Sequence, residues 1–340
     1  MMTLTFGVIG AGRIGQLHIN NLQNNKNVKI KWVSDLYCDK MSEWIEKAGV
    51  ENKTKDHMDI IRDPEVDAII ICSPTDTHVD IIKAAAANGK HIFCEKPISL
   101  SLEEAEEAVE SIQKSDVKLQ MGFNRRFDKN FKQLQGILNK KELGNVQTLR
   151  ITSRDPEPPP IEYIKRSGGL FMDMSIHDFD MARYLIQSEI VEVYATGEAL
   201  INPEIADYDD IDTALITLKF KNGSMAIIEN SRRSVYGYDQ RIEILGDYGA
   251  IDVGNEQSST LNYYRTDGIR RDNPPYFFLE RYSDAYKVEM DAFIAAIQND
   301  TDVICSIEDG YKAQQIALKC KESLISNQPK KYEEGCDVNR

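Results

Sequence analysis

Two side chains in the second half of the chain have the types and spacing of an acid–base pair. Asp173 and His177 are four residues apart in an apolar stretch whose pattern predicts a helix from about residue 171 to 186, so both face one side, with Asp180 next along it. A carboxylate beside an imidazole fixes its tautomer and raises its proton affinity, which suits a general base acting on an alcohol. The same spacing fits an ordinary ion pair on a helix surface, and spacing alone leaves both interpretations open.

A lysine in the first half of the chain offers a complementary charge. Glu95-Lys96-Pro97 follows an apolar run that reads as a buried strand, and Pro97 biases the backbone of Lys96 toward an extended conformation. An ammonium at the end of such a strand can stabilise a developing alkoxide. The alternative is a surface lysine.

A glycine-rich turn near the N-terminus has the pattern of a dinucleotide-binding loop. Gly10-Ala11-Gly12-Arg13-Ile14-Gly15 follows an apolar strand, opens a helix, and precedes Asp35 by 20 residues counted from Gly15. The first glycine permits the tight turn, the second lets a pyrophosphate approach, and the third lets helix and strand pack closely, while the helix N-terminus attracts the phosphates. The alternative is a turn that serves packing only.

Asp35 indicates which dinucleotide the loop would take. Its carboxylate can accept hydrogen bonds from ribose hydroxyls and would repel a 2′-phosphate, and Leu36 and Tyr37 offer no arginine to neutralise one. NAD is therefore favoured over NADP. FAD is a further alternative, but nothing later in the sequence resembles a second flavin-binding site.

A polar segment after another predicted strand, Ala68 to Cys72, is expected at the same edge of the sheet. The hydroxyls of the segment Cys72–His78, such as those of Ser73 and Thr75, would line the nicotinamide side of the cofactor cleft. The alternative is a capped helix, with Thr75 or Asp76 as the N-cap.

The elements that must position these residues change in rhythm near residue 122. Strands alternate with helices before that point, which predicts a parallel sheet covered by helices on both faces. Strand-like runs in series follow, with turn signals at Asn222-Gly223 and Asp247-Tyr248-Gly249, and predict an α+β domain with a large antiparallel sheet. We therefore expect an α/β domain over residues 1–122 and an α+β domain over residues 123–340.

Composition excludes several classes of protein. The chain has 340 residues, 41% hydrophobic and 28% charged, which suits a globular protein of about two domains. Its 41 Lys+Arg and 55 Asp+Glu give a net charge of −14, which makes nucleic acid an improbable partner. No apolar run is long enough to span a bilayer and no signal peptide is evident, so we expect a cytoplasmic protein. The six scattered cysteines predict neither a disulfide framework nor a metal site.

Four segments together resemble the glucose-fructose oxidoreductase/inositol dehydrogenase/rhizopine catabolism family, over essentially the whole chain. They are Gly10–Gly15 with His18, Glu95–Pro97, Gly122–Phe127 and Gly168–Asp180. The resemblance implies an N-terminal Rossmann domain that binds NAD and a C-terminal domain with an open-faced sheet used for oligomerisation, commonly a tetramer.

The resemblance also implies roles for particular residues. Lys96, Asp173 and His177 would form the catalytic set. The residues that would bind NAD are Gly10, Gly12, Arg13, Ile14, Gly15, Asp35, Ser73, Thr75, His78, Glu95 and Lys96, and those that would contact the substrate are Arg126, Asp155, Tyr236 and Tyr238.

The reaction implied is NAD-dependent oxidation of a hydroxyl of inositol to a ketone, with myo-inositol at its axial hydroxyl as the expected substrate. His177 would remove the hydroxyl proton with help from Asp173, Lys96 would stabilise the alkoxide, and no metal would be needed. Two alternatives remain: oxidation of another cyclic polyol or sugar, including scyllo-inositol or a hexose, and a non-catalytic NAD-sensing regulator, which would be expected to lose these groups.

Overall fold

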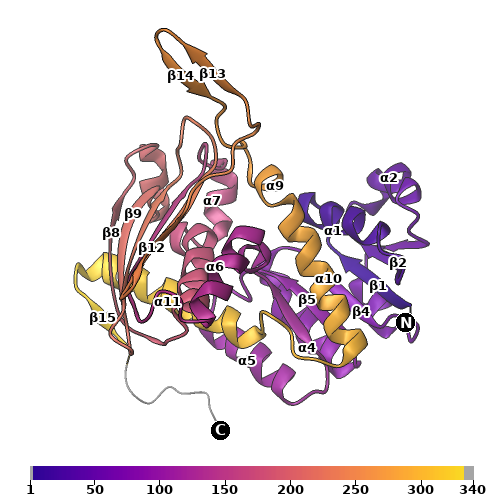
Figure 1. Cartoon of the computed structure of the whole chain (residues 1–340). Helices are drawn as coiled ribbons and strands as arrows, with labels where there is room; N and C mark the ends of the chain where they lie inside the picture. Colours follow the sequence, from indigo (N-terminus) through magenta and orange to yellow (C-terminus); the bar gives the residue numbers. More distant parts are fainter. Residues whose placement is uncertain (1–2, 333–340) are drawn as a thin grey trace. The chain divides into compact units, whose positions relative to one another are not determined.

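The computed structural model describes residues 3–332, which form two compact units (Figure 1). The first unit comprises the chain up to Phe127 together with Asp284–Gln314, and the second comprises Asp128–Ser283 and the chain from Gln315 onward. The sequence predicts a division between residues 122 and 123 and leaves open whether the late helices cover the second domain or return to the first; Asp284–Gln314 belongs to the first unit.

The first unit contains a parallel sheet. Its elements are β1 (Leu4–Ile9), α1 (Arg13–Gln23), β2 (Val28–Ser34), η1 (Cys38–Met41), α2 (Ser42–Lys47), β3 (Asn52–Thr54), α3 (His57–Arg62), β4 (Ala68–Ile71), η2 (Thr75–Thr77), α4 (His78–Ala87), β5 (His91–Glu95), α5 (Leu102–Gln113), β6 (Leu119–Gly122), η3 (Asn124–Phe127), nearly all of α10 (Ser283–Asn299) and the start of α11 (Ile307–Ser326). The six strands lie in the order β3-β2-β1-β4-β5-β6, and every pair is parallel. The predicted doubly wound domain is confirmed.

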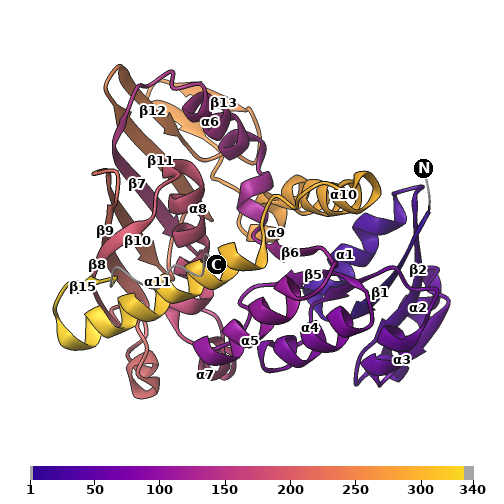
Figure 2. The same cartoon turned by 90° about the horizontal axis from the view of Figure 1, so that it is seen from below.

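Helices cover both faces of this sheet (Figure 2). On one face, apolar side chains of α1 and α10 pack with those of β1, β2 and β4 in a buried cluster that includes Phe6, Ile19 and Phe293. On the other face, Ile60 of α3 packs so closely against β1 that a Cβ at Gly7 would lie 2.1 Å from its side chain. Strand order reverses between β1 and β4, where open α/β sheets bind ligands at the carboxyl ends of the strands.

The second unit contains a larger, mixed sheet. Its elements are α6 (Lys129–Asn139), β7 (Val146–Arg154), α7 (Ile161–Ser167), η4 (Phe171–Ser175), α8 (Ile176–Ile186), β8 (Ile190–Glu198), η5 (Pro203–Tyr208), β9 (Thr213–Phe220), β10 (Met225–Ser231), β11 (Asp239–Gly246), β12 (Gly249–Val253), β13 (Asn262–Arg265), β14 (Gly268–Arg271), α9 (Phe278–Arg281), the rest of α11 and β15 (Lys330–Lys331). Seven strands lie in the order β12-β11-β7-β10-β9-β8-β15. All pairs are antiparallel except β7 with β10, so the predicted mostly antiparallel sheet is confirmed.

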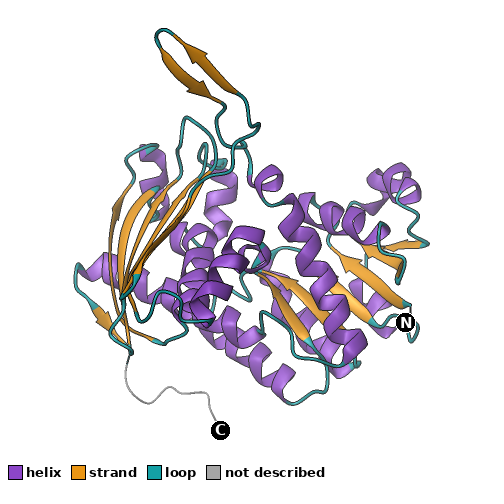
Figure 3. Cartoon of the chain, viewed as in Figure 1, coloured by secondary structure: helices purple, strands orange, loops and turns teal. Residues whose placement is uncertain are grey.

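The two faces of this sheet differ. Helices cover one face, where the alternate residues of β9 and β10 are buried, and the residues between them are exposed on the other face (Figure 3). The strands β13 and β14 pair only with each other, in a separate two-stranded hairpin outside this sheet. No helix within residues 3–332 combines the length and apolar character needed to cross a membrane.

Candidate active site

The glycine-rich loop has the geometry that its sequence predicts. Gly10 has φ +92°, and a Cβ there would lie 2.6 Å from the backbone of Cys72 and Ser73, so the loop after β1 packs directly on the loop after β4. A Cβ at Gly15 would lie 2.0 Å from the carbonyl oxygen of Gly10. At Gly12 nothing lies within 4 Å of the same position, which leaves open space at the N-terminus of α1, where a pyrophosphate would bind.

Asp35 lies beside this loop, directly after β2. Its carboxylate accepts hydrogen bonds from the amide of Ala11 at 2.9 Å and from the amide of Tyr37 at 2.8 Å. The carboxylate retains further lone pairs for ribose hydroxyls. The residues present therefore fit an NAD-type ribose and pyrophosphate.

The polar segment after β4 is ordered by its own side chains. Ser73 and Thr77 share a hydrogen bond of 2.6 Å between their hydroxyls. The ring nitrogens of His78 lie 2.8 Å from the carbonyl oxygen of Pro97 and 2.9 Å from that of Ser73, and burial lowers the pKa of this histidine. Its ring therefore ties the loop after β4 to the loop after β5, and cofactor binding by His78 stays a prediction.

The alternative interpretation of this segment, a helix with Thr75 or Asp76 as its N-cap, is wrong about which residue is the N-cap. Thr77, rather than Thr75 or Asp76, occupies the N-cap position of α4, and its side chain makes no capping hydrogen bond. Thr75 and Asp76 instead form a short 3₁₀ turn that precedes the helix, so the helix starts later than either candidate allows.

Lys96 follows β5 at the carboxyl edge of the same parallel sheet. It is half-buried, and the peptide bond that joins it to Pro97 is cis. Glu95, the last residue of β5, accepts a hydrogen bond of 3.0 Å from Nε2 of His18 on α1.

Arg126 has strong partners within the first unit. Its guanidinium donates to both carboxylate oxygens of Asp309, at 3.1 and 3.0 Å, and to the carbonyl oxygen of Ile304 at 2.9 Å. The side chain is only 5% exposed. These bonds hold the start of α11, a role that the sequence did not indicate, and substrate contact by Arg126 stays a prediction.

In the second unit, Asp173 and His177 are the two accessible side chains of a buried segment. Apart from these two, all residues from Leu170 to Ala182 are buried. Asp173 lies in the π-helical turn η4 and His177 in the first turn of α8, so the predicted single helix begins with a wider turn. Asp173, whose side chain is 13% exposed, and His177 are thus partly exposed within this segment, and their role as an acid–base pair stays a prediction.

The Asp173 carboxylate is held from two sides. Oδ1 accepts a hydrogen bond of 2.8 Å from the hydroxyl of Tyr163, and Oδ2 pairs with Arg232 at 3.1 Å. Burial and the charge of Asp173 raise the pKa of Tyr163, which therefore stays a hydroxyl donor. Sequence reasoning missed both partners, because nothing in the spacing links residues 163 and 232 to residue 173.

Arg232 is 1% exposed and gathers several acids around it. Burial alone would lower its pKa, but the charges of Asp173, Asp155 and Asp210 raise the pKa of this guanidinium. Asp155, a predicted substrate contact, thus lies in the same electrostatic neighbourhood as Asp173.

A buried polar network seats α8 on the sheet. Asp178 accepts hydrogen bonds from the hydroxyl of Ser153 at 2.5 Å and from the amide of Asn230 at 2.7 Å, and the Asn230 carbonyl accepts one of 2.6 Å from Ser175. All four residues are fully buried. The network joins the segment that bears Asp173 and His177 to β7 and β10, and so it limits the movement of that pair.

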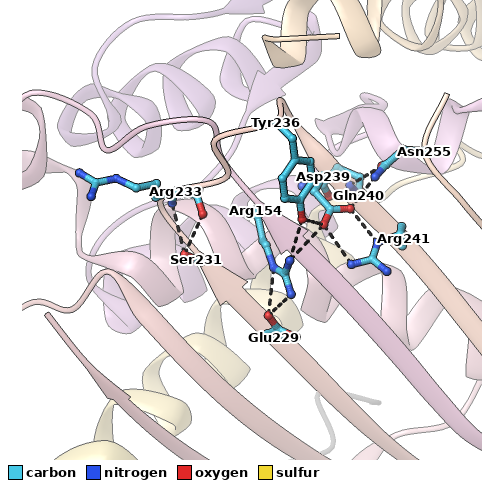
Figure 4. Close-up of polar contacts among 9 residues, drawn as sticks. All are labelled: Arg154, Glu229, Ser231, Arg233, Tyr236, Asp239, Gln240, Arg241 and Asn255. Carbon is cyan, nitrogen blue, oxygen red and sulfur yellow. Dashed lines mark hydrogen bonds and ion pairs between the residues drawn. The ribbon is translucent and has the colours of Figure 1, made fainter. Parts of the chain in front are cut away.

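The two predicted tyrosines have different surroundings. Tyr236 receives a hydrogen bond of 2.7 Å from Arg154 and donates one of 2.6 Å to Asp239, within a cluster that also includes Glu229 (Figure 4). Arg154 projects from the face of β7 opposite to Ser153, which bonds α8. Tyr238 is buried with its ring against Tyr282, at a centroid distance of 6.0 Å.

Comparison with known proteins identifies the class. Residues 4–123 match the oxidoreductase family with an NAD-binding Rossmann fold, and residues 131–252 match the C-terminal domain of the GFO/IDH/MocA proteins. The chain belongs to the GFO/IDH/MocA family of oxidoreductases, and its first unit is an NAD-binding domain.

Individual relatives are similar along nearly the whole chain. An uncharacterized oxidoreductase, YrbE of Bacillus subtilis (strain 168), is 50% identical over 323 residues, which are 95% of each chain. The myo-inositol 2-dehydrogenase of Thermotoga maritima is 45% identical over 331 residues, covering 97% of this chain and 99% of that protein. The crystal structure of scyllo-inositol dehydrogenase from Lactobacillus casei with bound NAD(H) and scyllo-inositol has a TM-score of 0.90 and 30% identity, and covers 97% of this chain and 99% of its own.

Proposed function

We propose that this protein is an NAD-dependent inositol 2-dehydrogenase that oxidises myo-inositol to the corresponding ketone. The observation that carries the proposal is the pair Asp173 and His177, which are partly exposed in an otherwise buried segment of a chain whose other unit binds NAD. The 45% identity to a myo-inositol 2-dehydrogenase supports the choice of substrate.

In this proposal, the side chains of the chain handle the proton while bound NAD supplies a nicotinamide ring that accepts hydride. His177 removes the proton of the hydroxyl that is oxidised. Asp173, held by Tyr163 and Arg232, keeps the imidazole oriented and stabilises its charged form. Lys96 donates to the oxygen as negative charge develops on it, and electrostatic stabilisation of this kind often lowers the barrier more than any other effect.

The proposal includes a preference for NAD over NADP. The Asp35 carboxylate, fixed by two backbone amides, would face the ribose hydroxyls and repel a phosphate there. The neighbouring side chains, Leu36 and Tyr37, are exposed and carry no positive charge to compensate.

The test is a steady-state assay of the purified protein with each cofactor and a panel of polyols. We expect NADH formation with myo-inositol and NAD to have the highest kcat/KM, weak activity with NADP, and large losses for isomers whose hydroxyl orientation leaves a buried polar group of the site without its partner. A higher kcat/KM with scyllo-inositol would favour that substrate, which a similar protein of known structure binds. Equal rates with glucose and inositol would contradict the proposal, and NAD binding without turnover of any polyol would favour a sensor.

We also propose that the protein assembles through the open face of its large sheet, as a homotetramer. Exposed apolar side chains occur on that face in three strands, namely Leu215 on β9, Met225 and Ile227 on the adjacent β10, and Leu245 on β11. Apolar residues gathered on one face commonly mark a protein interface.

A further inference from the structure

Three ionisable side chains meet inside the first unit, although they come from distant parts of the sequence. His18 lies on α1, Glu95 ends β5 and Glu289 lies on α10, and one nitrogen or oxygen atom of each lies within 4.8 Å of those of the other two. His18 and Glu289 are fully buried, and 15% of the Glu95 side chain is exposed. The reaction proposed above gives Glu289 no role.

His18 is fixed in its orientation toward Glu95. Its ring packs edge-on against Phe93 and Tyr286, at centroid distances of 5.0 and 5.9 Å. Its Nε2 lies 3.0 Å from Oε1 of Glu95, and because a carboxylate only accepts, Nε2 carries the hydrogen of this bond. One oxygen of Glu95 is thus held from the side of α1.

Glu289 approaches the same carboxylate from α10. Its backbone oxygen accepts a hydrogen bond of 2.8 Å from the buried Gln120, which ties this turn of α10 to β6. Among the described residues, neither oxygen of its side chain has a hydrogen-bond partner, and both are buried. A second negative charge this close to the Glu95 carboxylate is unfavourable, so the fully buried Glu289 is the carboxyl expected to hold a proton. Burial first, and then the charge of Glu95, raises the pKa of Glu289.

The Glu95–Glu289 pair also has neighbours on β5, directly after β4 and on β6. The Cys72 thiol after β4 lies near enough that, beyond burial, the charge of Glu95 raises its pKa, and the same holds for Cys94 on β5. From β6, a Cβ at Gly122 would lie 3.0 Å from the Glu95 carboxyl carbon, so backbone packs against that side. Lys96 is the next residue along the chain.

We propose that Glu289 is kept as a neutral acid and that, with His18, it fixes the Glu95 carboxylate and thereby orients Lys96. Glu95 and Lys96 share a peptide bond at the end of β5, so a fixed Glu95 restricts the backbone from which the lysine extends. Glu289 is therefore a positioning residue, and the inference rests on the function proposed for Lys96.

Infrared spectroscopy tests the protonation directly, without reference to activity. The wild-type protein at about pH 8, where an ordinary glutamate is ionised, is expected to show the C=O stretch of a protonated carboxylic acid. The band should be absent from Glu289→Gln and present in Glu106→Gln, a control at an exposed glutamate of α5. A wild-type spectrum without the band would overturn the proposal.

Kinetics then separate positioning from simple packing. Glu289→Gln keeps a neutral donor of the same shape, so we expect kcat and the Kd for NAD within about twofold of wild type. Glu289→Leu fills the space but cannot donate, and we expect kcat to fall about tenfold while the KM for inositol and the Kd for NAD stay nearly constant. Wild-type kcat in the leucine variant would remove the positioning role, and equal losses in both variants would show that an ionised Glu289 is needed.

The spectroscopic and kinetic results remain separable from the proposed function. If the leucine variant does not fold, as judged by circular dichroism and thermal unfolding, the infrared band and the glutamine variant still decide the matter. If wild-type protein oxidises no polyol, the dehydrogenase proposal fails while the band still reports whether Glu289 holds a proton.

Discussion

At the scale of single residues, the candidate base depends on how firmly Asp173 is held. A hydroxyl and a buried guanidinium each take one of its oxygens, at 2.8 and 3.1 Å. A carboxylate with its orientation fixed in this way can bind an imidazole in one tautomer only, whereas a mobile one would sample several. Tyr163 and Arg232 therefore hold the carboxylate of the proposed acid–base pair, although neither is evident from the sequence.

The prediction at this scale concerns His177. Replacing His177 with alanine should lower kcat by about 10² to 10⁴, because proton transfer by a positioned side chain contributes that much. The Kd for NAD, measured by titration, should not change, because His177 is in the second unit and the glycine-rich loop in the first. His57→Ala in α3 is the control, and unchanged kcat in the His177 variant would exclude this residue as the base.

At the scale of elements, the glycines of the first loop have separable roles. Gly10 and Gly15 are required by backbone packing, while the space around Gly12 is open. Gly10→Ala should lower the melting temperature, because the position combines positive φ with a 2.6 Å clash. Gly12→Ala should leave the melting temperature nearly unchanged and weaken NAD binding at least about tenfold, since the methyl group would occupy the phosphate site. Undiminished NAD affinity in Gly12→Ala would contradict this placement of the cofactor.

A second element-scale prediction concerns Asp63, which joins the end of α3 to β2. Burial alone would raise its pKa, but the ion pair with Lys31 at 2.7 Å and hydrogen bonds from Glu65 and Trp32 lower the pKa of Asp63 to about 2. A lowered carboxyl pKa stabilises the fold above the unfolded-state value near 4 and loses this contribution as pH falls toward 2. After allowance for solvent screening, Asp63→Asn should cost about 1 kcal/mol at pH 7.

The measurement is thermal unfolding of both proteins across that range. The difference in melting temperature between wild type and Asp63→Asn should be constant above about pH 5 and shrink below it. A difference that does not depend on pH would mean that the charge of Asp63 is not what stabilises this contact.

At the scale of the whole molecule, the open sheet face should decide assembly. Replacing both Leu215 and Ile227 with lysine places two charges on the exposed face of adjacent strands, and should reduce the mass measured by light scattering below that of a tetramer. Val288→Lys, at an exposed position on α10, is the control. The same mass for the wild type, the double variant and the Val288→Lys control would show that this face is not the subunit interface.

Several features of the protein follow from the sequence because they depend on residues close together in the chain. The glycine spacing, the alternation of strands and helices before residue 122, and the interval from Asp173 to His177 each reflect a local periodicity. Local periodicity predicted the parallel sheet, the NAD loop and the mostly antiparallel second sheet. It missed elements such as β3, α3 and α7, whose short segments carry too few repeats to show a pattern.

The tertiary structure alone decided which distant side chains meet. Arg232 pairs with Asp173, Asp309 pairs with Arg126, and Glu289 reaches Glu95, across separations that no spacing rule connects. These contacts depend on which strands lie side by side and on the return of α10 to the first unit. The sequence by itself therefore determined the chemistry available to this protein, while the packing of remote elements decided which of those groups are held in place and which are buried.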